Sequence, residues 1–104
     1  MEKFYIGEVE RKREVWGEQL RRGRFEIIGE ILTITADGTG GAVKTTIVYR
    51  ANLNFNIANR YLNMLLQEGL IRVVDGPTMK YRITERGLKF LGMYKNLKGM
   101  AKSL

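Results

Sequence analysis

The sequence predicts a small α+β domain that is mostly helical. Apolar residues recur at helical spacing over most of the chain, and only one pair of adjacent segments is β-prone. At 104 residues the chain is long enough for one domain with a modest core. It divides into an N-terminal extension (1–23), a central domain (24–84) and a C-terminal helix (85–104).

The N-terminal extension carries no strong pattern. Its apolar residues would share one narrow stripe of a helix, but glycines interrupt that stripe. The stripe consists of Ile6, Val9, Trp16 and Leu20. Residues 1–23 are therefore expected to form a short, loosely docked helix or to be disordered, and the sequence leaves both open.

The central domain begins with two predicted helices. The first runs from residue 24 to about Asp37, and its broad apolar face is made by Phe25, Ile27, Ile28, Ile31, Leu32 and Ile34. A glycine-rich connection at 38–41 follows and is expected to be flexible. The second helix spans about 44–51 and turns Ile47, Val48 and Ala51 inward.

A third helix carries the most informative pattern in the chain. Asn54 is its predicted N-cap and Gly69 its C-terminal stop. Asparagines cluster here, and the polar residues share an arc of about 100°: Asn56, Asn59, Arg60, Asn63 and Gln67. Asparagine is a mediocre helix former, whereas Asn and Arg pair well with adenine and guanine edges in a DNA major groove. This helix is predicted to read a duplex.

Two β-prone segments, 70–74 and 79–83, follow this helix and are joined by a turn over 75–78. Because strand side chains alternate, Lys80 and Arg82 share one face of this hairpin, opposite Tyr81. Thr84 is then expected to cap the last helix. Helix, helix–turn–helix and hairpin, in this order, make a winged helix.

The C-terminal helix carries apolar residues at heptad spacing. They are Phe90, Met93, Leu97, Met100 and Leu104, flanked by Tyr94. We expect this seam to pair two chains in a homodimer. The alternative is that the helix packs back onto its own domain, since two heptads are too few to establish a coiled coil.

The helical and strand positions of the remaining aromatic residues predict their environments. Tyr49, Tyr61 and Tyr81 are predicted to face the core. Phe55, at the first turn of the third helix, is predicted to be partly buried, with contact to a sugar or a thymine methyl as the alternative.

Composition narrows the function. A net charge of +7 and a pI near 9.9 point to a polyanionic partner. The absence of cysteine and histidine removes zinc sites of those ligands, thiol nucleophiles and histidine acid–base chemistry. No carboxylate pair or ligand cluster stands out, so we predict no enzyme, no metal and no cofactor. No apolar run is long enough to span a membrane, and a soluble cytoplasmic protein of the nucleoid is expected.

One segment imitates a nucleotide-binding loop. Residues 38–46 nearly match the phosphate-cradling P-loop motif. However, Val43 stands where the motif requires glycine, and the preceding segment has helical rather than strand periodicity. We therefore expect no nucleotide cofactor.

The chain also resembles the archaeal winged helix–turn–helix proteins, a family that includes the ten-kilodalton chromatin-associated proteins of hyperthermophiles. The shared marks are Lys44-Thr45, Tyr49, Asn52-Leu53, Tyr61-Leu62, Leu65, Gly69-Leu70-Ile71, and Tyr81 with Ile83-Thr84-Glu85 and Gly87. The resemblance is close over 43–98, loose over 24–42 and absent over 1–23. It implies a double-stranded DNA-binding protein that dimerises through its C-terminal helix as an antiparallel coiled coil. That helix is shorter here than is usual in the family.

The predicted DNA contacts fall into three groups. Phosphate contacts are assigned to Lys44, Thr45 and Thr46, although one threonine could serve only as a helix cap. Base contacts in the major groove are assigned to Asn54, Asn56, Asn59, Arg60 and Asn63, with Arg60 facing guanine and Asn59 facing adenine. The wing contributes Lys80 and Arg82.

Three functions follow from different classes. A dimeric, sequence-preferring transcriptional regulator is favoured by the asparagine-rich helix. An architectural chromatin protein that coats DNA is favoured by the basic C-terminal segment. A winged helix used for protein–protein contact is the third, although Glu68 is the only acidic residue of the third helix.

Overall fold

The computed structural model describes residues 22–38 and 40–103. Residues 1–21, with the stripe around Trp16, lie outside the described residues, as do Thr39 and Leu104. The prediction for the N-terminal extension is therefore untested.

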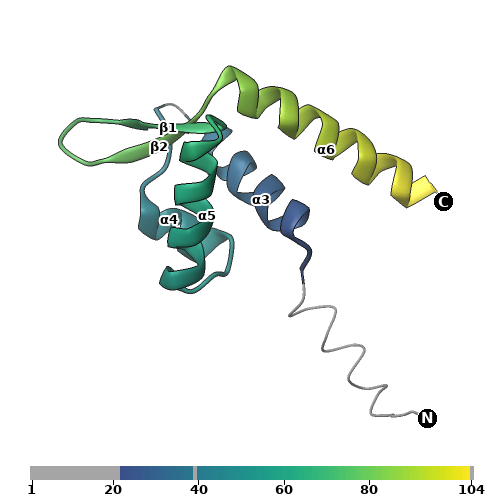
Figure 1. Cartoon of the computed structure of the whole chain (residues 1–104), viewed down its shortest axis with the longest axis horizontal. Coiled ribbons are helices and arrows are strands. Elements are labelled where there is room, and N and C mark those ends of the chain that lie inside the picture. The colour runs from purple at the N-terminus through teal and green to yellow at the C-terminus, as the bar shows by residue number, and fades with distance from the viewer. Residues whose placement is uncertain (1–21, 39, 104) are drawn as a thin grey trace, which may run out of the picture.

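The described part consists of helices and one hairpin in the predicted order (Figure 1). The elements are α3 (Arg24–Ala36), α4 (Lys44–Arg50), α5 (Phe55–Gln67), β1 (Ile71–Val74), β2 (Lys80–Ile83) and α6 (Glu85–Ser103). The hairpin and α6 extend away from the three-helix body in different directions (Figure 1). The predicted α+β class and winged-helix architecture are confirmed.

The core lies where α3, α4, α5 and the base of the hairpin meet. Its largest fully buried apolar side chains come from every one of these elements: Ile31, Leu32, Ile47, Leu62, Leu65 and Ile71. Complete burial of a Leu or Ile side chain contributes about 1.5–3 kcal/mol. Burial of these side chains orients α5 with its polar arc toward solvent.

A third chain segment pairs with the hairpin. β1 and β2 are antiparallel, and Ala42 forms an additional antiparallel bridge with Tyr81. The Ala42 amide donates to the Tyr81 carbonyl at 2.8 Å, and the Tyr81 amide donates back to the Ala42 carbonyl at 2.7 Å. The end of the glycine-rich connection is thus hydrogen-bonded to the sheet, which the sequence prediction of a flexible connection missed. Gly41 has φ +97°, and a Cβ there would meet the Tyr81 carbonyl.

Helix α5 begins and ends, and helix α6 begins, at the capping residues that the sequence predicts. The Asn54 side chain accepts a hydrogen bond from the Ile57 amide at 2.8 Å and caps α5. Gly69 follows the end of α5 with φ +74°. The Thr84 hydroxyl accepts from the Gly87 amide at 3.0 Å and donates to the Gly69 carbonyl at 2.6 Å. Thr84 therefore caps α6 and also ties its start to the end of α5.

Two aromatic predictions were wrong. Tyr49 is 86% exposed, and Phe55 is 52% exposed. On α4, Ile47 and Ala51 point inward, and Tyr49 is about 200° around the helix from Ile47, so it faces solvent. Phe55 lies in the first turn of α5, beyond the end of the core. Tyr81 is buried, and Tyr61 is partly buried against the core, as predicted.

The apolar residues of the α6 heptad seam lie in two different environments. Phe90 and Tyr94 pack against the protein's own core, and the Phe90 ring stacks on Phe25 with 6.3 Å between ring centroids. The other described members, Met93, Leu97 and Met100, are exposed. The seam prediction therefore needs correction at Phe90 and Tyr94, because Gly29 of α3 leaves room for α6 to dock on that side.

Candidate nucleic-acid interface

The polar arc of α5 lies at the surface. Asn56, Arg60 and Asn63 are exposed, and Asn59 is half-buried. The opposite side of the helix carries the buried residues Ala58, Leu62 and Leu65. Residues of one helical face are thus presented together, in the arrangement needed to enter a groove.

Asn54 stands apart from this group. Its side-chain oxygen is already engaged with the Ile57 amide at the start of α5. That oxygen is the acceptor of the bidentate pattern by which asparagine pairs with adenine. Asn54 is therefore a helix cap in this structure, as its position predicts, and its further assignment as a base-contacting residue stays a prediction.

The start of α4 offers side chains for backbone contacts. Val43 occupies the N-cap position, with no side-chain capping bond, so neither Thr45 nor Thr46 is the cap of α4. Thr45 is exposed, while Lys44 and Thr46 are half-buried. The alternative that a threonine serves only as the cap is removed.

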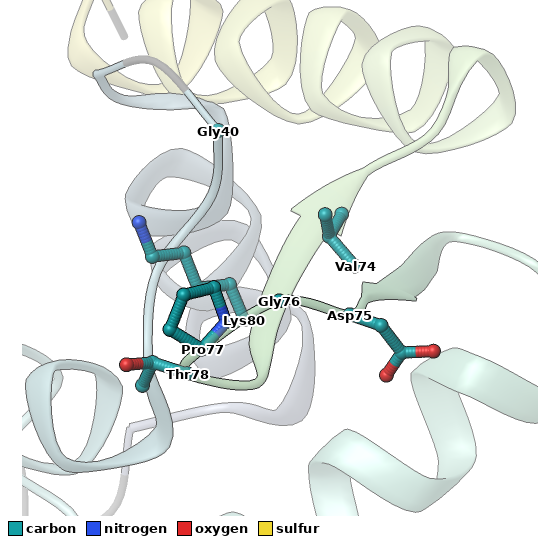
Figure 2. A pocket seen from close by; sticks show the side chains of 7 residues that line it. All are labelled: Gly40, Val74, Asp75, Gly76, Pro77, Thr78 and Lys80. Atoms are coloured by element: carbon teal, nitrogen blue, oxygen red, sulfur yellow. The ribbon is translucent and has the colours of Figure 1, made fainter.

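The wing lies directly beside the start of α4. Because Ala42 pairs antiparallel with Tyr81, Val43 is aligned with Lys80 in the neighbouring strand. Figure 2 shows the hollow of the wing, lined by Gly40, by 74–78 and by Lys80. There the Lys80 side chain projects toward one side and Asp75 toward the other, so Asp75 does not neutralise it (Figure 2). The structure thus brings Lys80 and Lys44 into one region.

Sequence reasoning missed Arg72. The register pairs Arg72 with Arg82, so both guanidinium groups project from the same face of the hairpin. Both residues are exposed. Like charges directly opposite one another destabilise a strand pair unless an anion lies between them. The alternation of β1 could have indicated Arg72, but only with the register known.

The basic residues of this surface are not ion-paired within the described chain. The described ion pairs join Arg22 to Glu30, Arg50 to Asp37 and Arg86 to Glu68. None of them involves α5 residues of the polar arc or the wing. A surface rich in unpaired cations attracts polyanions at long range.

The P-loop resemblance has no structural counterpart. The segment before the glycines is helix α3 rather than a strand. The Ala42 amide, which a phosphate cradle would need as a donor, bonds to Tyr81 instead. Within residues 22–38 and 40–103, no group of acidic side chains could hold a metal ion. No described helix is long and apolar enough to cross a membrane.

Comparison with known proteins agrees with this arrangement. The sequence model of the winged helix–turn–helix family matches residues 21–102. An uncharacterised protein of the archaeon Methanocaldococcus jannaschii is 36% identical over 69 residues, which is 66% of either chain. The chain thus spans just under two thirds of that relative.

Solved structures share the fold. Sso10a-2, a DNA-binding protein from Sulfolobus solfataricus, has a TM-score of 0.67 and 25% identity, covering 79% of this chain and 84% of its own. MepR, the transcription regulator of a Staphylococcus aureus multidrug efflux pump, has a TM-score of 0.65 and 15% identity. The match covers 88% of this chain and 70% of MepR. A possible HxlR family transcriptional factor from Thermoplasma volcanium has a TM-score of 0.58 and 18% identity. The match covers 94% of this chain and 84% of that factor.

The described elements define a winged helix–turn–helix domain, a fold that the DNA-binding protein Sso10a-2 shares. This chain belongs to the winged helix–turn–helix family. Among its structural neighbours, Sso10a-2 is a DNA-binding protein and MepR is a transcription regulator.

Proposed function

We propose that this protein binds double-stranded DNA as a dimeric transcriptional regulator. The observation that carries the proposal is the exposed polar arc of α5. In the same domain the start of α4 lies beside the wing, because Ala42 pairs with Tyr81. The core holds these three elements together, so they can meet a duplex without rearrangement.

Each part of this surface has its own role on DNA. Asn56, Asn59 and Asn63 enter the major groove with Arg60, which pairs with guanine, while Asn59 pairs with adenine. Phosphate contacts come from Lys44, Thr45 and Thr46. The wing engages the adjacent groove or backbone through Lys80 and Arg82, and the exposed Arg72 extends that surface.

A second copy of the chain covers the exposed part of the α6 seam. Met93, Leu97 and Met100 are exposed on one side of the helix, and Phe25 beside Phe90 is 69% exposed. Contiguous apolar surface of this kind marks an interaction site. Two α5 helices in one dimer would then contact two half-sites one helical turn apart.

A role in DNA architecture is the second candidate. α6 adds basic side chains at Lys89, Lys95 and Lys98, remote from the polar arc in sequence. A protein that contacts only phosphates binds every sequence alike and must be abundant to coat DNA. The asparagines of α5 favour the regulator, because a coating protein has no need for them.

Use of the fold for protein–protein contact is the weakest candidate. Glu68, at the end of α5, is the only acidic residue of that helix region. A polar arc with no acidic residue suits DNA better than it suits a basic protein surface. A DNA-bound role also implies a cytoplasmic location with the nucleoid.

Fluorescence anisotropy tests the proposal. The full chain is titrated onto a labelled random-sequence 30-base-pair duplex at several salt concentrations, with unlabelled genomic fragments as competitors. Affinity should fall linearly on a log–log plot against salt. A regulator should select fragments that compete about a thousandfold better than random DNA, whereas a coating protein would select none. No binding at low salt would overturn the proposal.

A further inference from the structure

A second basic region lies at the start of α3, which is on the side of α5 away from the tip of the hairpin (Figure 1). Arg24, the first residue of α3, and Arg60 of α5 line one surface hollow together with Tyr61 and Met64. Both arginines are exposed. The sequence pattern does not indicate that Arg24 lies near α5, because 36 positions separate it from Arg60.

The direction of Arg24 follows from the face it occupies. Residues 24, 28, 31 and 35 follow one stripe of α3, and the last three, Ile28, Ile31 and Thr35, are buried in the core. Arg24 continues that stripe one turn beyond the core. Its side chain therefore extends toward α5 rather than away from the body, which explains the hollow shared with Arg60.

No acidic group of α3 competes for this arginine. Glu26 and Glu30 lie more than about 100° around the helix from Arg24. Glu30 is already engaged with Arg22, whose guanidinium also donates to the Asn52 carbonyl at 3.2 Å. Among the described residues Arg24 has no ion-pair partner. Those described residues that line the hollow include two arginines and no acidic residue.

Arg22 also holds this region in place. By bonding Glu30 of α3 and Asn52 in the turn before α5, it joins the start of α3 to the helix–turn–helix. These bonds fix the start of α3, and with it the backbone of Arg24, relative to the turn before α5.

We propose that Arg24 binds a DNA backbone phosphate on the strand that borders the major groove opposite the wing. This inference rests on the proposed DNA-binding function and adds a contact on the second strand. Lys44 and Lys80 would contact the backbone on one side of the inserted helix α5, and Arg24 the backbone on the other. Arg60, between them, remains free to reach a base.

The test compares charge variants of the full chain by anisotropy over a salt series. In Arg24→Gln the slope of log affinity against log salt should become shallower by about one unit. Affinity at low salt should fall about tenfold on every duplex alike. Arg24→Lys should keep most of the slope, because a lysine can still neutralise the phosphate. Arg86→Gln is the matched control, since Arg86 is exposed and pairs with Glu68 at the other end of α5.

The outcomes separate this contact from the proposed function. If the wild type binds DNA and Arg24→Gln keeps its slope and affinity, the phosphate contact is wrong and the proposed function stands. A change of base preference without a change of slope would also overturn it, because Arg24 would then read a base. If the wild type fails to bind at low salt, both proposals fall. Melting temperatures of all variants check that each one is folded.

Discussion

The ring of Tyr94 occupies the space in which a side chain at Gly29 would sit, so α6 rests directly on the backbone of α3. This contact sets where the C-terminal helix leaves the domain. It also explains why Tyr94 and Phe90 pack on the protein's own core while Met93 and Leu97 remain exposed. The same docking determines which side of α6 is left for a partner.

A double-mutant cycle tests this contact. Gly29→Ala should lower the free energy of unfolding by about 1–3 kcal/mol, because the new methyl overlaps the ring. In a Tyr94→Ala background the same change should raise it by up to about 1 kcal/mol, since only the better helix propensity of alanine remains. Urea titration measures both. If Gly29→Ala changed the free energy of unfolding in the same direction in both backgrounds, the contact between Tyr94 and Gly29 would be contradicted. Gly92→Ala, which faces open space, should stabilise α6 and serves as control.

Because Asn54 caps α5, substitutions at this position are expected to change the stability of the fold without changing DNA affinity. Asn54→Ala should cost about 1 kcal/mol of stability, because the Ile57 amide loses its acceptor. Asn54→Ser should restore most of that loss, since serine is an equally good cap. The serine variant should also bind DNA as the wild type does. A clear loss of affinity in that variant would instead support Asn54 as a base-contacting residue.

The exposed seam predicts the oligomeric state. Leu97 is 67% exposed, so Leu97→Asp should leave the fold intact. A charge in an apolar contact between two chains is costly, and the variant should sediment as a monomer. It should also bind a duplex with two half-sites more weakly. Leu88→Asp, on a different face of α6, should leave the mass in solution unchanged. An unchanged mass for Leu97→Asp would contradict the dimer.

The pairing of Arg72 with Arg82 predicts opposite effects on stability and binding. Arg72→Ala should raise the free energy of unfolding by about 0.2–1 kcal/mol at low salt, because it removes one of the two like charges that face each other across the strand pair. High salt should reduce that gain. DNA affinity should fall in the same variant, whereas Arg72→Lys should change neither property much. Equal DNA affinity in Arg72→Ala would remove Arg72 from the interface.

Arg60 distinguishes base reading from backbone binding. Arg60→Ala should cost about 1–3 kcal/mol on the preferred site and relax the preference at one base pair. Competition by duplexes that differ at single positions measures this. A loss that is equal on all sequences would make Arg60 a phosphate contact.

Much of the fold could be predicted because its signals are local. The N-cap at Asn54, the stop at Gly69 and the cap at Thr84 each depend on residues within a few positions in the chain. The period of apolar residues likewise predicted α3, α5 and the hairpin. These features required no knowledge of distant contacts.

The errors share one physical cause. Periodicity says which residues share a face, but not which face another element covers. The helical position of Tyr49 predicts an inward side chain, yet none of the described elements packs over its side of α4. The bridge between Ala42 and Tyr81 joins residues 39 positions apart, and neither carries a sequence signal for that pairing.

The sequence by itself determined the winged-helix order of elements, the caps and the polar arc of α5, since each arises from neighbouring residues and from helix or strand period. Only the tertiary structure decided that Arg72 faces Arg82, that Arg24 shares a hollow with Arg60 and that Tyr94 docks on Gly29. These relationships depend on strand register and on packing between distant segments. Such packing is governed by the shape of the whole core, which no short window of sequence contains.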